Sequence, residues 1–217
     1  SSTPARDGGS VETGLLQYEA VAQNTPDILH YYKSGAVTFP TTLERNLAER
    51  PGKQRSLLLY NWKPSQSHTW RQIADGQADG NIATVAAGLK AYPHKLFLNI
   101  YHEPDDNVVE TAGSGMTTAD YADMYRHVVD EMRSLGVTNV VFVWNVMGYD
   151  GWRQHFDGLY PGHDYVDWIC YDPYAKDNLV PDMSRLVNRP KANLGWPGFY
   201  SWATAKAPGK PVSYTHL

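Results

Sequence analysis

The chain is poor in residues on which several protein classes depend. Its 217 residues include one cysteine, Cys170, so it can form no intrachain disulfide and has no paired thiols for a structural zinc site. We expect Cys170 to be a buried strand residue. The net charge is −4 and basic residues form no long run, which argues against nucleic acid or an anionic membrane surface as a partner. No apolar run approaches the roughly 18 residues of a membrane span, and no signal peptide begins at Ser1.

Sequence motifs for common cofactors and metals are missing as well. No G-x-G-x-x-G follows the first apolar runs, and no His-Glu-x-x-His occurs. Asp105 and Asp106 lack the regularly spaced oxygen ligands of a calcium loop, and we interpret them as a solvated acidic turn. The sequence therefore predicts no cofactor and no metal, and it leaves the oligomeric state open.

Aromatic residues with a polar atom are abundant. The chain has 7 Trp and 15 Tyr against 5 Phe, and such rings suit sites that bind sugars through apolar faces and hydrogen bonds together. Hydrophobic residues make up 42% and charged residues 19%, which is ordinary for a globular domain. Residues 1–25 read as a flexible leader, and residues 26–217 as one domain, because nothing like a linker divides them.

Short apolar runs alternate with helical patterns along this domain. Runs of this length are typical of buried strands, and their alternation with helices predicts a parallel α/β sheet. Both a barrel and a doubly wound sheet fit the pattern. The expected strands cover 27–32, 56–62, 95–100, 139–145 and 165–171, with another starting near 212; the expected helices cover 42–50, 79–90, 118–135 and 181–187.

Polar and aromatic residues follow these strands where each one ends. In a (β/α)8 barrel all such ends meet at one rim, where active sites are built. Glu103 is the most informative of them, because a partly buried carboxylate beside His102 suits an acid or base. The alternative is an ordinary loop carboxylate. The residues at the strand ends are Asn61 and Trp62, His102 and Glu103, Trp144 and Asn145, and Asp172 and Tyr174.

Several of these segments resemble glycoside hydrolase family 26. Residues 97–103, closed by the His-Glu pair, are similar to the family's acid/base segment, and the run from Tyr160 to Tyr174 is similar to its sixth-strand segment. Trp144-Asn145 resembles the end of the fifth strand, and residues 60–62 resemble the end of the third. The resemblance extends from about Pro26 to Val212.

The resemblance implies a secreted (β/α)8 barrel whose signal peptide is not in this chain. It also implies retaining endo-hydrolysis of β-linked polysaccharides, mainly β-1,4-mannan, with β-xylan or mixed-linkage β-glucan in some members. Glu103 would be the general acid/base, and His102 would bind near the cleaved bond. Asp172 could position a substrate hydroxyl or cap a loop. The aromatic residues expected to line the sugar-binding cleft are Trp62, Trp144 and Tyr174.

The sequence departs from the family pattern in places that bear on activity. Retaining hydrolysis needs a second carboxylate about 5–5.5 Å from the first. The family's nucleophile segment begins with Lys-Pro, as at Lys210-Pro211, but here His216 stands near the nucleophile position. About six of eight strands are recognisable, so we expect a chain truncated at its C-terminus, and possibly at its N-terminus, with very low hydrolysis. Residues 213–217 read as a foreign tail.

Two alternatives and one question of specificity stay open. The chain could be a carbohydrate-binding barrel without catalysis, or an incomplete fragment whose exposed strand edges associate. The family's mannanases commonly carry Arg four residues before the acid/base, where this chain has Asn99. This departure keeps β-xylan and mixed-linkage β-glucan beside mannan as candidate substrates.

Overall fold

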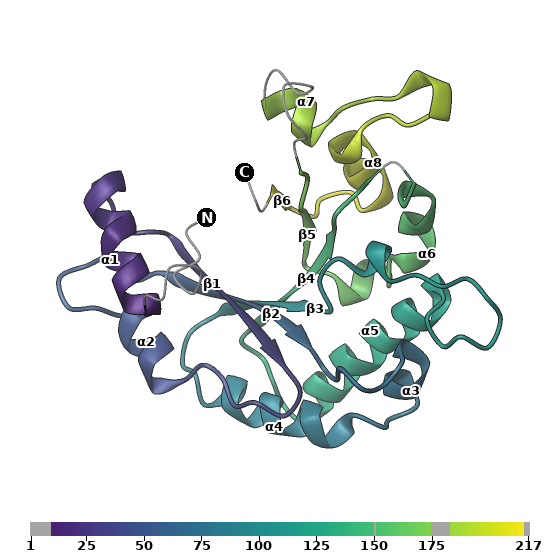
Figure 1. Ribbon diagram of the computed structural model, residues 1–217. Coiled ribbons are helices and arrows are strands. Elements are labelled where there is room, and N and C mark those ends of the chain that lie inside the picture. The colour runs from purple at the N-terminus through teal and green to yellow at the C-terminus, as the bar shows by residue number, and fades with distance from the viewer. Residues whose placement is uncertain (1–9, 150, 175–182, 215–217) are drawn as a thin grey trace.

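A computed structural model describes residues 10–149, 151–174 and 183–214 (Figure 1). Within these residues six parallel strands form one sheet in the order β1-β2-β3-β4-β5-β6. Each strand thus lies beside its neighbours in the sequence. The strands are β1 (Ile28–Ser34), β2 (Leu57–Lys63), β3 (Leu96–Ile100), β4 (Val140–Val146), β5 (Trp168–Tyr171) and β6 (Val212–Tyr214).

This strand order distinguishes between a barrel and a doubly wound sheet, both of which fit the sequence pattern. A doubly wound sheet reverses its strand order at a switch point, whereas a barrel adds each strand beside the previous one. Figure 1 shows a curved sheet with α2 to α6 along its outer side. The structure therefore confirms an incomplete barrel of six strands. The helices are α1 (Val11–Ala22), α2 (Thr42–Ala48), α3 (Trp70–Ala74), α4 (Asp79–Lys90), α5 (Thr118–Ser134), α6 (Phe156–Leu159), α7 (Met183–Val187) and α8 (Phe199–Lys206).

Helix α5 shows why the predicted helices form. Its N-cap is Thr117, one residue before the expected Thr118. The Thr117 hydroxyl accepts the N–H of Asp120 at 3.1 Å, and the Asp120 carboxylate accepts the N–H of Thr117 at 3.0 Å. One face of the helix, which includes Tyr121 and Val128, is fully buried against the sheet. Capping and an apolar stripe together define this helix.

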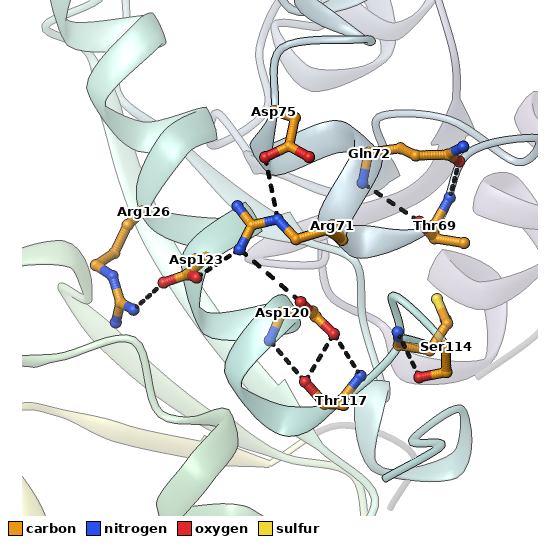
Figure 2. Close-up of polar contacts among 10 residues, drawn as sticks. Thr69, Arg71, Gln72, Asp75, Ser114, Thr117, Asp120, Asp123 and Arg126 are labelled. Atoms are coloured by element: carbon orange, nitrogen blue, oxygen red, sulfur yellow. Dashed lines mark hydrogen bonds and ion pairs between the residues drawn. The ribbon is translucent and has the colours of Figure 1, made fainter. Parts of the chain in front are cut away.

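A network of ion pairs joins α3 to α5 on the outer surface (Figure 2). The guanidinium of Arg71 lies 2.8 Å from Asp123, 3.1 Å from Asp75 and 3.8 Å from Asp120, and Arg126 also pairs with Asp123. These side chains are partly exposed, so each pair contributes at most about 1 kcal/mol. The network links α3 to the first turns of α5.

Strands β2 to β5 are largely buried on both faces, but the two faces differ in character. Leu58, Tyr60 and Trp62 of β2 point toward the helices and have no exposed surface. Asn61 points the other way, toward the barrel interior, and in the sheet register it lies between Tyr32 of β1 and Asn99 of β3. The interior face therefore carries polar side chains near the carboxyl ends of the strands. Cys170 of β5 is buried, as predicted.

The segment expected to be a flexible leader contains a helix instead. Ser10 caps α1 by accepting the N–H of Thr13 at 3.1 Å. Glu19 forms an ion pair with Arg50, and this bonding lowers the pKa of the Glu19 carboxyl. Residues 11–22 are therefore ordered against the rest of the chain, while the domain boundary at residue 25 stays a prediction. The helices α3, α6 and α8 were not predicted, because they are short and lack a long apolar stripe.

Candidate functional site

Glu103 lies on a sharp turn that directly follows β3. Tyr101 and Glu103 both have φ of 54°, a left-handed conformation that is uncommon for residues other than glycine. Each such residue costs on the order of 1 kcal/mol or more, and strain of this kind concentrates at functional sites. Pro104 then opens a short 3-10 helix (Pro104–Asp106). The turn leaves the Glu103 side chain partly exposed at the carboxyl edge of the sheet.

Two polar links join this turn to the end of β4. The backbone N–H of Glu103 donates to Oδ1 of Asn145 at 3.1 Å. The Asp105 carboxylate accepts the N–H groups of Met147 at 3.0 Å and Gly148 at 2.8 Å. The loop after β3 and the loop after β4 are thereby held together. The backbone position of Glu103 depends on both strands.

Asp105 corrects a prediction, because it is not part of a solvated turn. Its side chain is 1% exposed, whereas Asp106 is exposed as expected. Burial raises the pKa of the Asp105 carboxyl to about 6, although its backbone hydrogen bonds act in the opposite direction. The two N–H donors from the β4 loop explain why a carboxyl group is tolerated there.

The Glu103 carboxylate contacts the aromatic side chain that follows β5. The hydroxyl of Tyr174 donates to Oε1 of Glu103 at 3.4 Å, and Asp172 is buried nearby. Burial raises the pKa of the Tyr174 phenol, and the charges of Asp172 and Glu103 raise it further. The same three causes, in the same order, raise the pKa of Tyr32, which lies two residues before the end of β1. Three strand ends therefore bring two carboxylates and two phenols together.

His102 and the interior amides complete this cluster. The His102 ring lies edge-on to Tyr32 with centroids 5.1 Å apart, and both residues line a hollow of about 300 Å³. Nδ2 of Asn99 donates to Oδ1 of Asn61 at 2.9 Å. A second hollow of about 400 Å³ includes Tyr174 in its wall. The first hollow thus adjoins His102, the residue before Glu103. The second adjoins Tyr174, the hydrogen-bond partner of Glu103.

Trp62 and Trp144 correct another prediction, because neither faces this cluster. Both indoles have no exposed surface and point into the helix layer. Nε1 of Trp62 donates to the carbonyl of Gly35 at 3.0 Å, and Trp144 packs edge-on against Tyr160 with ring centroids 5.5 Å apart. Successive strand residues point to opposite faces, so Asn61 and Asn145 face the interior and their tryptophan neighbours belong to the core.

Of the six site residues expected from the sequence, four lie together at the strand ends and two lie in the core, and three neighbours of the cluster were not expected. His102, Glu103, Asp172 and Tyr174 gather at the strand ends. Tyr32, Asn99 and Asp105 were not assigned to the site, although Tyr32 closes the strand expected at residues 27–32 and could have been found by that criterion. The roles of all these residues stay predictions. His216, expected near the nucleophile position, lies outside the described residues.

Among the described residues no three His, Cys, Asp or Glu side chains are grouped to hold a metal ion. No helix there is long and apolar enough to cross a membrane.

Comparison with known proteins identifies sequence relatives. The model of glycosyl hydrolase family 26 matches residues 77–191. Endoglucanase H of Acetivibrio thermocellus is 29% identical over 168 residues, or 75% of this chain and 18% of that protein. Beta-1,3-xylanase TXYA of a Vibrio species is 31% identical over 129 residues, 55% of this chain and 27% of that protein. A mannan endo-1,4-beta-mannosidase of Bifidobacterium adolescentis is 27% identical over 89 residues, 40% of this chain and 9% of that protein. The chain thus spans less than a third of these relatives.

Solved structures share the fold at low sequence identity. The GH26 domain of a Prevotella bryantii endo-beta-mannanase/endo-beta-glucanase is 12% identical, with a TM-score of 0.55, covering 94% of this chain and 80% of that one. The GH26 beta-mannanase BoMan26A of Bacteroides ovatus is 15% identical, with a TM-score of 0.58, covering 91% of this chain and 64% of that one. At such identities the similarity concerns the fold.

Proposed function

The chain belongs to glycosyl hydrolase family 26, and on that basis we propose that it carries the acid/base half of a retaining endo-glycosidase site. The single observation that carries this proposal is the position of Glu103. It stands on a strained turn at the strand ends, tied to Asn145 and contacted by Tyr174. In the proposed reaction Glu103 protonates the leaving glycosidic oxygen and later removes a proton from the attacking water.

The neighbours of Glu103 have proposed supporting roles. The Tyr174 hydroxyl orients the carboxyl group, and Asp172 positions a substrate hydroxyl or the Tyr174 and Tyr32 phenols. His102 binds the sugar beside the cleaved bond, in the hollow that it shares with Tyr32. Asn61 and Asn99 form the polar floor beneath them. The proposal assigns no substrate contact to Trp62 and Trp144, because both side chains are buried.

The proposed substrate is a β-linked polysaccharide, with β-1,4-mannan as the first candidate. Mannanases occur both among the sequence relatives and among proteins of the same fold. An endoglucanase and a β-1,3-xylanase match longer parts of the chain, so glucan and xylan belong in the same test. Because such polymers are too large to enter a cell, we also propose that the protein acts outside the cell. Mass spectrometry of the culture medium of the producing cells tests the location; recovery from the cells alone contradicts it.

We further propose that this chain cleaves slowly by itself. Retaining chemistry requires a carboxylate nucleophile, and residues 211–217 contain no Glu or Asp. The same observation favours a second candidate function, binding of the polysaccharide without cleavage. Affinity electrophoresis in gels that contain mannan, glucan or xylan measures binding, and release of reducing sugar measures cleavage. Binding of the polysaccharide, with release of reducing sugar near the rate in buffer alone, supports the proposal of slow cleavage. Release of reducing sugar at ordinary enzyme rates overturns that proposal.

Azide rescue separates the two candidate functions. Azide supplies the missing nucleophile: it attacks the anomeric carbon of a 4-methylumbelliferyl β-mannobioside, the bond to the aryl oxygen breaks, and that oxygen takes the proton of Glu103. The product is an α-linked glycosyl azide. We expect Glu103→Gln to lower the azide-dependent rate by about 10²–10⁴-fold. Asp106→Asn, an exposed acid on the same turn, serves as the matched control. Equal rates for Glu103→Gln and the unaltered chain contradict the glycosidase proposal.

A further inference from the structure

The hollow of about 300 Å³ beside His102 has a polar wall that the acid/base role of Glu103 does not use. It lies at the carboxyl ends of β1 and β2, and it includes a residue of the loop that follows β2. Its volume is at the lower end of the range of about 300–1,000 Å³ that is usual for small-molecule sites. We call it the Lys63 hollow, and the residues that line it are Tyr32, Lys33, Ser34, Lys63, Gln66 and His102.

Lys63 lies on the interior face of the sheet. Strand side chains alternate between faces, so Lys63 shares the face of Asn61, two residues before it. In the register of β1 and β2, Ser34 lies beside Lys63 and Tyr32 lies beside Asn61. The Lys63 hollow is therefore one step nearer the carboxyl ends of the strands than the hydrogen bond between Asn61 and Asn99.

The two lysines that line the Lys63 hollow differ in their partners. The Lys33 ammonium pairs with the Glu44 carboxylate, which is buried. The Lys63 ammonium instead lies over the Tyr101 ring, 4.5 Å from its centroid. Within residues 10–149, 151–174 and 183–214, no carboxylate forms an ion pair with Lys63. Lys63 can therefore donate hydrogen bonds to a ligand without breaking an ion pair.

Gln66 and Tyr32 add an acceptor and an aromatic ring to this wall. Nε2 of Gln66 donates to Oγ of Ser34 at 3.0 Å, which ties the loop after β2 to the end of β1. A side-chain amide also carries a carbonyl oxygen, and no group in the described part of the chain donates to Oε1 of Gln66. Tyr32 is 51% exposed, so its ring is accessible to a ligand. The Lys63 hollow thus combines an ammonium donor, an amide acceptor and a ring, which together suit a sugar.

We propose that Lys63 is a specificity-determining residue, which binds one sugar unit of the β-linked polysaccharide through its free hydroxyl groups. This inference rests on the proposed function, since the unit belongs to the chain that Glu103 cleaves. A hydroxyl both accepts and donates hydrogen bonds, so it suits the donor-only ammonium of Lys63 and the Oε1 acceptor of Gln66 together. The Tyr32 ring packs against the apolar face of the same unit. A unit that lacks the hydroxyl forgoes a hydrogen bond to a charged donor and is bound more weakly.

Calorimetry with lysine variants tests the proposal. The unaltered chain, Lys63→Met and Lys95→Met are each titrated with β-1,4-mannotetraose, cellotetraose and β-1,4-xylotetraose. Methionine keeps an unbranched side chain and removes the ammonium, and Lys95 is an exposed lysine immediately before β3, at the opposite end of the sheet. We expect Lys63→Met to bind the preferred tetraose about tenfold more weakly than the unaltered chain, because a hydrogen bond from a charged donor is lost. Lys95→Met should bind it as the unaltered chain does.

A series of deoxy sugars distinguishes a direct contact from a structural role of Lys63. Analogues of the preferred tetraose, each lacking one hydroxyl group, are titrated into the unaltered chain and Lys63→Met. We expect one analogue to bind the unaltered chain about tenfold more weakly than the parent sugar does. Lys63→Met should bind that analogue and the parent equally, because the variant has already lost the interaction. A merely structural role would weaken the binding of both sugars and keep the difference between them.

The outcomes that overturn the proposal are distinct from those that overturn the glycosidase function. The proposal fails if the unaltered chain binds none of the tetraoses, if Lys63→Met binds as the unaltered chain does, if Lys95→Met shows an equal loss, or if every analogue distinguishes the two chains by the same factor as the parent. Azide rescue is scored separately. If it fails while binding depends on Lys63, only the glycosidase function falls; if it succeeds while Lys63→Met binds normally, only the Lys63 contact falls.

Discussion

The hydroxyl of Tyr174 lies 3.4 Å from Oε1 of Glu103 and donates a hydrogen bond to it, although the two residues are 71 positions apart in the sequence. Tyr174 is 43% exposed and contributes little to the core. We predict that Tyr174→Phe lowers the azide-dependent, Glu103-dependent rate about 2- to 10-fold, the value of one hydrogen bond, and leaves the free energy of unfolding unchanged. Tyr200→Phe, at an exposed tyrosine on α8, is the control. A rate equal to that of the unaltered chain would contradict an orienting role.

Asp105 gives a prediction about stability and pH. Its folded pKa of about 6 exceeds the ordinary value of 3.8, so between these pH values the folded chain holds a proton that the unfolded chain has lost. Stability from this group is therefore present at about pH 4 and is lost as pH rises to about 6. At about 1.4 kcal/mol per pKa unit, the loss is about 3 kcal/mol.

Asp105→Asn removes this titration. We predict that the variant is destabilised at about pH 4, because an amide cannot accept both N–H groups of the β4 loop. The difference from the unaltered chain then shrinks, or changes sign, as pH rises above 6. Urea denaturation of both proteins at pH 4, 5, 6 and 7 measures it. Asp106→Asn is the exposed control, and parallel curves for Asp105→Asn and the unaltered chain contradict the prediction.

Trp62 and Tyr174 should respond in opposite ways to substitution. Trp62 is fully buried and donates to Gly35, so Trp62→Phe should cost about 1–3 kcal/mol of unfolding free energy. It should leave the affinity for a β-1,4-mannooligosaccharide unchanged at temperatures where the variant is folded. Tyr174→Ala should weaken that affinity with little loss of stability. Loss of affinity in Trp62→Phe without loss of stability would restore the role of a sugar platform.

The contrast between Trp62 and Asn61 shows where sequence analysis reached its limit. Strand positions and their C-terminal ends were predictable, because the apolar runs are short and the stops are polar. The face of the sheet on which each side chain lies could not be predicted. In strands buried on both sides the apolar run does not alternate, so it cannot indicate whether Asn61 or Trp62 points to the interior.

Residues whose partners lie far along the chain mark a second limit. The partners of Asp105 are the backbone N–H groups of Met147 and Gly148, far along the chain. No local sequence pattern predicts these hydrogen bonds. Arg153 and Arg189 likewise belong to segments that only the fold brings together. His102 and Glu103, by contrast, are adjacent in the sequence and follow a strand, which is why their position at a strand end could be predicted and the residues around them could not.

The central claim is that Glu103 donates the proton to the leaving oxygen, and leaving-group dependence tests it most directly. Azide-dependent release is measured for the unaltered chain and for Glu103→Ala with two aryl β-mannobiosides. A 4-methylumbelliferyl group is the poorer leaving group and gains much from protonation, whereas a 2,4-dinitrophenyl group leaves readily without it. We predict that Glu103→Ala lowers the rate about 10²-fold or more for the first substrate and only a few-fold for the second. Equal losses for both substrates would contradict the assignment of Glu103 as the general acid.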